Sequence, residues 1–377
     1  MGLVELAIKQ LIKRKKIVEN GGINSIPTNL KRFSKYFPGI EKGTYYGVTG
    51  QTKAGKSQLA SYLFLYTPIL YSYYNPDKAS VKVFYYPLEE SQERVIHRFI
   101  SYLLYVFYDK EISPRDLRST SNIALSDEIV NLINSDTIQS ILKHFESCVY
   151  FSTERNPTGI YKEIKTYCEN AGTSYYNDVN YQDKNGQPVT IKQFSHYEPN
   201  NENEYVIAFL DHISLLSIER SYTLRETINK MSQYFVELRN MYNITPVVIQ
   251  QQAAVLSADN IKADLIRPTR DALSDSKDTS KDFNYLIGIF SPHHYKLASY
   301  LGYDISLLKD SIRFIELILS RDGVSGTMIA TDFNGAVCNF KELPLPNDEK
   351  MKDIYQSKAN PFTVVKSFFI KLLTNKN

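Results

Sequence analysis

The chain has 377 residues, of which 43% are hydrophobic and 23% are charged, and its formal net charge is +3. A globular protein of this length can bury one large core or two modest ones. The small net charge excludes a strong basic field over the whole surface, although a local basic channel for nucleic acid needs no such excess.

The cysteines and the hydropathy pattern indicate the compartment. Cys148, Cys168 and Cys338 lie far apart and form no C-x-x-C pair, which argues against a zinc site and a disulfide framework and fits a reducing compartment. No apolar run approaches the length of a membrane span, and the N-terminus lacks the apolar core of a signal peptide. We therefore expect a cytoplasmic protein.

The first predicted element is a helix over residues 3–19, where apolar residues recur at helical spacing. Two glycines at 21–22 end this helix, and its basic cluster at 13–16 is interpreted as a solvated face. A short linker follows. We assign residues 1–25 to an N-terminal linker helix and residues 26–343 to one main domain.

Within the main domain, predicted strands alternate with predicted helices. The strands are expected at 44–49, 81–86, 148–151, 205–210, 245–250, 284–290, 312–319, 326–331 and 336–340. The helices are expected at 56–66, 91–108, 126–146, 158–170 and 222–242. Several strands are continuous apolar runs, which is typical of a mostly parallel sheet buried on both faces. The last four strands follow one another without long helices and indicate an antiparallel edge, so the fold class is α/β with helices on both faces.

Two regions have weaker patterns. Residues 172–203 are rich in Asn, Tyr, Gln and Asp without clear periodicity, and we expect a long polar loop there. Residues 344–377 are expected to form a C-terminal tail that ends in PFTVVKSFFIKLL. That segment predicts a short amphipathic helix at 361–373, which docks on its own domain or, as the alternative, on a partner or a membrane.

The most informative motif follows the predicted strand 44–49. It reads Gly50-Gln51-Thr52-Lys53-Ala54-Gly55-Lys56-Ser57, which is GxxxxGK[ST] between a strand and a helix. The glycines let backbone N–H groups turn toward phosphate oxygens, and the helix adds its positive end. The Lys56 amine can reach the β- and γ-phosphates, and the Ser57 hydroxyl can bind Mg²⁺. The motif predicts that the chain binds a nucleoside triphosphate such as ATP.

Hydrolysis also needs acidic groups near this loop, and two strand ends offer them. The apolar strand 205–210 ends in Asp211, the Walker B arrangement that holds Mg²⁺ through water, with the capping of a turn as the alternative role. The strand 81–86 is expected next to the phosphate loop and is followed by Glu89 and Glu90. We predict that Glu89 polarises the attacking water and that Glu90 points elsewhere, unless both are helix N-terminal acids.

Two further segments could complete a catalytic site. The strand 245–250 leads into Gln250-Gln251-Gln252, where a glutamine either senses the γ-phosphate or reflects low complexity. Arg321 lies at a strand-to-turn junction, where an arginine can act as a finger in a neighbour's active site.

Taken in order, these segments resemble the RecA-like motor domain of the DnaB-type replicative helicases over residues 25–343. The motifs that carry the resemblance are GQTKAGKS, FYYPLEES, VIAFLDHISLL, TPVVIQQQ, RPTRDALSDSKDTSKDFNYLIGIF and ELILSRDGVSG. The phosphate loop is shared by many NTPases. The LEE placement, the RP…D…S…D segment and R-x-G-x-x-G are the more specific signals.

The resemblance implies a hexameric ring around single-stranded DNA, with ATP and Mg²⁺ bound between subunits. By matching motif, the implied roles are phosphate and Mg²⁺ binding for Lys56 and Ser57, catalytic base for Glu89, Walker B acid for Asp211, γ-phosphate sensor for Gln251 and trans-acting finger for Arg321. The segment between Gln252 and Pro268 corresponds to the channel-facing loop. Lys262 and Arg267 are therefore candidate DNA contacts, with simple solvation as the alternative.

The chain also departs from the family pattern. Leu319 stands where a lysine usually precedes the finger by two residues, and Gln250-Gln251 replaces the Ser-Gln of the sensor motif. Residues 1–25 carry only a helix similar to the family's linker helix, which docks on the adjacent subunit, in place of the helical domain that engages primase. These departures bear on trans activation and on a primase or helicase loader as partner, and a compact motor would suit a phage or mobile-element replisome.

Three functions therefore stay open at the level of sequence. The first is an ATP-dependent DNA helicase or translocase that acts on single-stranded DNA as a ring in DNA replication. The second is a recombinase-like or regulatory ATPase that binds DNA without unwinding it. The third is a nucleotide-binding structural protein with degraded catalysis, which Leu319 favours.

Overall fold

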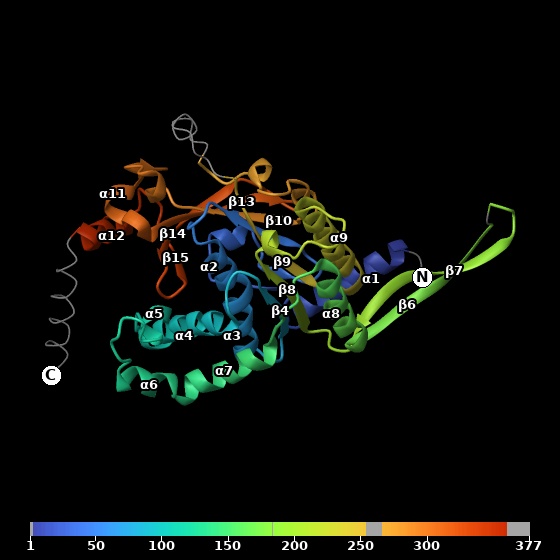
Figure 1. Ribbon diagram of the computed structural model, residues 1–377, viewed down its shortest axis with the longest axis horizontal. Coiled ribbons are helices and arrows are strands. Elements are labelled where there is room, and N and C mark those ends of the chain that lie inside the picture. The colour runs from blue at the N-terminus through green and yellow to red at the C-terminus, as the bar shows by residue number, and fades with distance from the viewer. Residues whose placement is uncertain (1–2, 183, 254–265, 360–377) are drawn as a thin grey trace.

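The protein is organised around a nine-stranded sheet, seen in a computed structural model that describes residues 3–182, 184–253 and 266–359 (Figure 1). The strand order across the sheet is β15-β14-β13-β10-β3-β9-β8-β4-β5. In chain order these strands are β3 (Tyr46–Gly50), β4 (Ser80–Pro87), β5 (Val149–Phe151), β8 (Glu204–Asp211), β9 (Thr245–Gln251), β10 (Tyr285–Phe290), β13 (Ile312–Ser320), β14 (Thr327–Asn334) and β15 (Asn339–Glu342). Each lies at a predicted strand, with small differences at the ends.

Strand direction divides the sheet into two parts. β10, β3, β9, β8, β4 and β5 run parallel, whereas β13, β14 and β15 pair antiparallel with their neighbours. The predicted mostly parallel sheet with an antiparallel edge is confirmed, but the edge begins at β13 rather than at β10. The reason is that residues 252–284 connect β9 to β10, and this connection is long enough for a parallel crossover.

Helices cover both faces of the sheet, as predicted. One face carries α2 (Lys56–Ser61), a π-helical turn (Tyr62–Tyr66), α3 (Thr67–Tyr74), α4 (Gln92–Tyr108) and α7 (Asp136–Cys148), with α5 (Pro114–Leu117) and α6 (Asp127–Ile133) beside α4. The other face carries α8 (Pro157–Asn170) and α9 (Leu224–Tyr242). Each layer buries an apolar stripe, and the two stripes form separate hydrophobic clusters on opposite sides of the sheet. The result is a three-layer α/β/α core.

Residues 172–199 form a two-stranded hairpin, which corrects the predicted polar loop. β6 (Gly172–Gln182) pairs antiparallel with β7 (Pro188–Pro199), and the hairpin projects from the body at the right of Figure 1. Its Tyr, Val, Thr and Ile residues favour strands, and Gly186 in the connection has φ +75°. The Asn-Gly pair at 185–186 is a usable hairpin signal, which the surrounding polar residues obscure.

Both ends of the described chain are helical. α1 (Leu3–Glu19) confirms the first predicted helix. α12 (Glu349–Ala359) occupies part of the predicted polar tail and buries Met351 in a small cluster with Tyr303. This cluster also draws on β11 (Ser299–Tyr300), β12 (Tyr303–Asp304) and α11 (Ile305–Leu308). The helix predicted at 361–373 lies outside the described residues.

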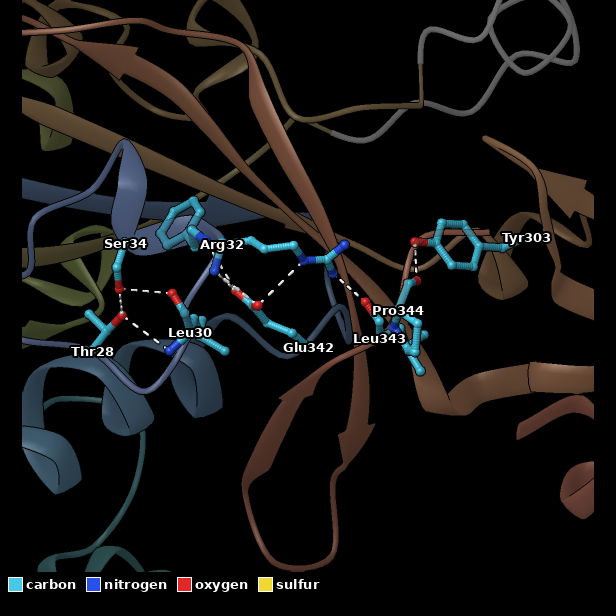
Figure 2. A network of polar contacts seen from close by, with 9 residues as sticks. Thr28, Leu30, Arg32, Ser34, Tyr303, Glu342, Leu343 and Pro344 are labelled. Carbon is cyan, nitrogen blue, oxygen red and sulfur yellow. Dashed lines mark hydrogen bonds and ion pairs between the residues drawn. The ribbon is translucent and has the colours of Figure 1, made fainter. Parts of the chain in front are cut away.

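A polar network joins the beginning of the main domain to the last strand of the sheet (Figure 2). The backbone N–H groups of Arg32 and Phe33 donate to the Glu342 carboxylate over 2.9 to 3.0 Å. The Arg32 guanidinium also donates to the carbonyl of Leu343. The segment between β1 (Ser25–Ile26) and β2 (Ile40–Glu41), two short strands that pair with each other, is thus fixed beside β15.

Candidate nucleotide-binding site

The phosphate loop lies at the end of β3, and two glycines shape it. A Cβ atom on Gly50 would stand 2.3 Å from the carbonyl oxygen of Ile289, so the close approach of β10 leaves no room for a side chain. Gly55 has φ +101°, a left-handed conformation that favours glycine, and α2 begins at the next residue. The loop therefore curls between strand and helix as the motif predicts.

The Lys56 amine is folded back onto this loop. Its Nζ donates a hydrogen bond of 3.0 Å to the carbonyl of Gln51, and the residue is buried. Burial lowers the pKa of Lys56, while the nearby carboxylates of Glu89 and Asp211 raise it. A buried amine beside acidic groups is a favourable place for a further anion such as a phosphate.

Ser57 and Asp211 meet beside the phosphate loop. The Ser57 hydroxyl donates to Asp211 Oδ1 over 3.1 Å, and Asp211 is only 2% exposed at the end of the buried strand β8. Burial raises the pKa of Asp211 to about 6, a shift that Glu89 also favours and the Ser57 hydrogen bond opposes. A carboxylate that is costly to ionise in isolation gains from a neighbouring cation.

The donor set fits Mg²⁺ rather than a metal held by protein alone. Mg²⁺ prefers hard oxygen ligands and usually keeps water and substrate phosphates in its coordination shell. Ser57 and Asp211 offer one hydroxyl and one carboxylate oxygen at the same point. Among the residues that the structure describes, no group of three His, Cys, Asp or Glu side chains could hold a metal ion, so phosphates and water would have to complete the shell.

Glu89 and Glu90 leave β4 in different directions. Glu89 is exposed, and its charge affects the pKa values of Lys56, Asp211 and His212, which places it near all three. Glu90 forms an ion pair with Arg98 of α4, as expected for a residue that points away from the site.

The strand that carries these two acids is not beside the phosphate-loop strand, contrary to the prediction. β9 and β8 separate β4 from β3 in the sheet. Glu89 nevertheless reaches the site because β4 ends alongside β8, where the backbone N–H of Leu88 donates to the Asp211 carbonyl over 2.8 Å.

The three glutamines after β9 have separate partners, so low complexity does not describe them. Gln251 Nε2 lies 3.4 Å from His212 Nε2, beside the Walker B position. Gln250 donates to the carbonyls of Ser274 and Ser276, and Gln252 donates to the Thr49 hydroxyl. The outer two therefore anchor the segment that follows the loop, and the middle one faces the site.

His212 is a site residue that the sequence reasoning missed. It directly follows Asp211, it is buried, and burial lowers its pKa. Within the described residues its Nδ1 has no hydrogen-bond partner. Its place immediately after the Walker B aspartate was the available signal.

The candidate DNA-contacting residues lie at one end of the segment after Gln252. Gln51 Nε2 donates to the Ala253 carbonyl over 3.2 Å, which ties the start of this segment to the phosphate loop. Lys262 lies outside the described residues. Arg267 forms an ion pair with Glu316 of β13, so any contact of Arg267 with DNA would require that pair to open or share its guanidinium.

Arg321 lies far from the phosphate loop of its own chain. β13 begins beside the loop, where Arg313 donates to the Ala54 carbonyl, and it runs antiparallel to β10 until Ser320 faces Tyr285. The eight residues from Arg313 to Arg321 span about 26 Å of extended strand. At that far end Arg321 Nε donates to the Phe283 carbonyl over 2.8 Å. A single chain therefore does not bring Arg321 to Lys56.

Two solved structures resemble this architecture. One is a helicase ATPase domain that is 13% identical in sequence, with 91% of this chain and 100% of that domain covered and a TM-score of 0.64. The protein has the fold of a RecA-like helicase ATPase domain. The second is a DnaB-like replicative helicase, described together with its interactions with primase, at 13% identity and a TM-score of 0.60, covering 89% of this chain and 66% of that chain.

The sequence itself has no match, either to a family model or to a curated protein. At 13% identity the two structures establish the RecA-like fold of DnaB-like helicase domains, which confirms the predicted fold class. None of the helices in the described part of the chain is long and apolar enough to cross a membrane.

Proposed function

We propose that the chain is an ATP- and Mg²⁺-dependent DNA helicase or translocase that works as a ring-shaped homo-oligomer, a hexamer, on single-stranded DNA in replication. The observation that carries this proposal is the separation of Arg321 from the phosphate loop within one chain. A site that needs both parts must take them from two subunits, and head-to-tail contacts of this kind close into rings.

Within one subunit, four side chains would bind and activate the triphosphate. Lys56 would leave the Gln51 carbonyl for the β- and γ-phosphates, and Ser57 and Asp211 would hold Mg²⁺. The metal ion would neutralise charge that develops on the phosphate oxygens. Glu89 would orient the attacking water and accept its proton, a role that its exposure and its place beside Lys56 support.

The other half of the site would come from the neighbouring subunit. Arg321 would exchange its carbonyl partners for the γ-phosphate of the adjacent subunit and stabilise the transition state. A row of exposed apolar residues on α1 supports a subunit contact as well. Val4, Ile8, Leu11 and Ile12 are 51–74% exposed at helical spacing, and a face of this kind is stabilised by burial against a neighbour.

The segment after Gln251 would carry the nucleotide state to DNA. Gln251 would sense the γ-phosphate together with His212, and the hydrogen bond from Gln51 to Ala253 joins the phosphate loop to the same segment. Lys262 remains a proposed DNA contact. For Arg267 we propose contact through the exposed part of its guanidinium while Glu316 positions it.

The setting of this motor is also a proposal. A compact RecA-like domain preceded by α1 fits a phage or mobile-element replisome in the host cytoplasm, with a primase or helicase loader as a possible partner class. One of the two similar structures is a helicase that interacts with primase, and the present chain spans 66% of it.

A second function is favoured by one specific observation, a nucleotide-binding protein with degraded catalysis. Leu319 occupies the place of the usual lysine, and its side chain packs against the α8 and α9 cluster. The finger of a DnaB-like enzyme would therefore act without a second cation two residues away.

DNA-stimulated ATPase activity separates these functions. The purified protein should hydrolyse ATP, faster with single-stranded DNA, and Lys56→Ala should abolish turnover. Unwinding of a forked duplex would then establish the helicase. ATP binding without turnover would favour the degraded protein, and ATPase activity indifferent to DNA, with no unwinding, would refute the motor.

A further inference from the structure

One arginine lies buried directly behind the phosphate loop. Arg313 is the second residue of β13 and is only 2% exposed, within the otherwise apolar run at the start of that strand. A buried guanidinium is costly unless its N–H groups are paired. The partners of Arg313 therefore indicate why the strand carries a charge at this position.

Its guanidinium makes a contact to the phosphate loop itself. Arg313 Nε donates to the Ala54 carbonyl over 2.9 Å. Its Nη1 donates to the carbonyls of Asp310 and Ile312 over 2.6 and 2.9 Å, and its Nη2 donates to Asp310 Oδ1 over 3.0 Å. The four contacts hold the plane of the guanidinium in one orientation, because its donors form a rigid fork.

An aromatic ring fixes the same arrangement from the side. The Phe333 ring centre lies 4.7 Å from the Arg313 Cζ atom, a cation–π distance. The ring also borders the loop, since a Cβ atom on Gly55 would lie 3.4 Å from Phe333 Cζ. Arg313 and Phe333 thus support two consecutive loop residues, Ala54 and Gly55.

Peptide geometry converts this contact into an effect on phosphate binding. In a planar trans peptide, the carbonyl of one residue and the N–H of the next point in opposite directions. Arg313 holds the Ala54 carbonyl on the side of β13, so the N–H of Gly55 is directed to the opposite side of that peptide plane. In a phosphate loop the inward side is where N–H groups meet phosphate oxygens.

We propose that Arg313 is a positioning residue for the triphosphate: it fixes the Ala54–Gly55 peptide so that its N–H faces the phosphates, and it adds a buried positive charge behind the loop. This inference rests on the proposed nucleotide-binding function. It assigns the start of β13 to phosphate binding in the same subunit, whereas Arg321 at the end of that strand serves a neighbour.

Asp310 moderates the charge. Its carboxylate pairs with Arg313, yet its side chain is 72% exposed. An exposed carboxylate offsets part of the guanidinium's field while water screens it, so its removal leaves Arg313 more positive toward a bound phosphate. A purely structural pair would weaken nucleotide binding whichever partner is lost, whereas the proposed role predicts opposite effects.

The test measures ADP and adenosine binding by calorimetry in the presence of Mg²⁺, with wild type, Arg313→Gln, Arg313→Lys and Asp310→Asn. Arg313→Gln should raise the Kd for ADP about tenfold and leave that for adenosine unchanged, because one charge-assisted hydrogen bond to the loop is lost. Arg313→Lys should recover part of the affinity by restoring charge without the fork. Asp310→Asn should lower the Kd for ADP about twofold to threefold, and less at high salt.

The outcomes separate this inference from the function on which it rests. A wild type that binds no ADP would refute both. A wild type that binds ADP, with a folded Arg313→Gln variant of equal affinity, would refute the role of Arg313 alone. Should Arg313→Gln fail to fold, Asp310→Asn decides: weaker or equal ADP binding overturns the inference, and tighter binding supports it.

Discussion

Ser57 Oγ and Asp211 Oδ1 lie 3.1 Å apart, which brings together the first turn of α2 and the last residue of β8. The two residues are 154 positions apart in the chain, so the fold alone creates the pair. The hydroxyl compensates only part of the cost of burying Asp211, and the pKa of Asp211 stays raised at about 6. The site therefore stores a destabilising charge that a bound cation would relieve.

The first prediction concerns stability and pH. Below pH 3.8 Asp211 is protonated in both states, and between pH 3.8 and about 6 the folded state binds more protons, so stability falls as pH rises through this window. The shift corresponds to roughly 3 kcal/mol at neutral pH. Asp211→Asn should therefore stabilise the metal-free protein at pH 7.5 and change it little at pH 3.5, as measured by urea unfolding.

The control for this prediction is Asp353→Asn, an exposed aspartate on α12. Its unfolding free energy should stay within about 0.5 kcal/mol of wild type at both pH values. Equal or lower stability of Asp211→Asn at pH 7.5 would show that the Asp211 carboxylate carries no such cost.

The second prediction contrasts neighbouring acids. Glu89→Gln should lower ATP turnover at least about 100-fold and leave ADP affinity unchanged, because it removes a proton acceptor without removing a phosphate contact. Glu90→Gln should instead cost about 1–3 kcal/mol of stability, since Arg98 loses its ionised partner in a largely buried position. Single-turnover assays and thermal melts of both variants provide the measurements. Reversed phenotypes would place the catalytic acid at Glu90.

Local patterns made part of this site predictable from sequence. The phosphate loop and the aspartate after an apolar strand each depend on a few consecutive residues, and both fold as expected. The glutamines were ambiguous because their partners, His212, Ser274 and Thr49, come from three other segments. No pattern within the tract distinguishes the middle glutamine from the outer two.

Other features depend on pairings that a single sequence does not display. The position of β4 away from β3, with β9 and β8 between them, results from the strand order, and the contact of Arg313 with Ala54 joins positions 259 residues apart. Arg267 reads as a solvated cation until Glu316 is brought beside it by β13. The hairpin of β6 and β7 was missed because polar residues interrupt its strand-forming residues.

The third prediction tests whether active sites are shared. Lys56→Ala and Arg321→Ala should each be inactive alone, but mixing them should restore ATPase activity. An interface with the phosphate loop of one variant and the finger of the other is intact, and random assembly makes about one quarter of the interfaces so. Activity is measured after subunit exchange at different mixing ratios, with a maximum expected near equal amounts.

A mixture of Lys56→Ala with Glu89→Gln is the matched control. Both changes damage the half of the site that one subunit supplies, so no interface in this mixture is complete and no activity should return. Failure of the first mixture, when native mass spectrometry shows that the two variants have assembled together, would place Arg321 outside the shared site.

The fourth prediction concerns the exposed apolar face of α1. Leu11→Glu places a charge where we propose contact with a neighbouring subunit, and it should shift the protein from oligomer to monomer in sedimentation experiments. Because Leu11 is 67% exposed, the monomer's own unfolding free energy should change by less than about 0.5 kcal/mol. Gln10→Glu adds the same charge on the opposite side of the helix and should leave the oligomer intact. Were Leu11→Glu to assemble like Gln10→Glu, the subunit contact would have to lie elsewhere, and the apolar row would need another partner.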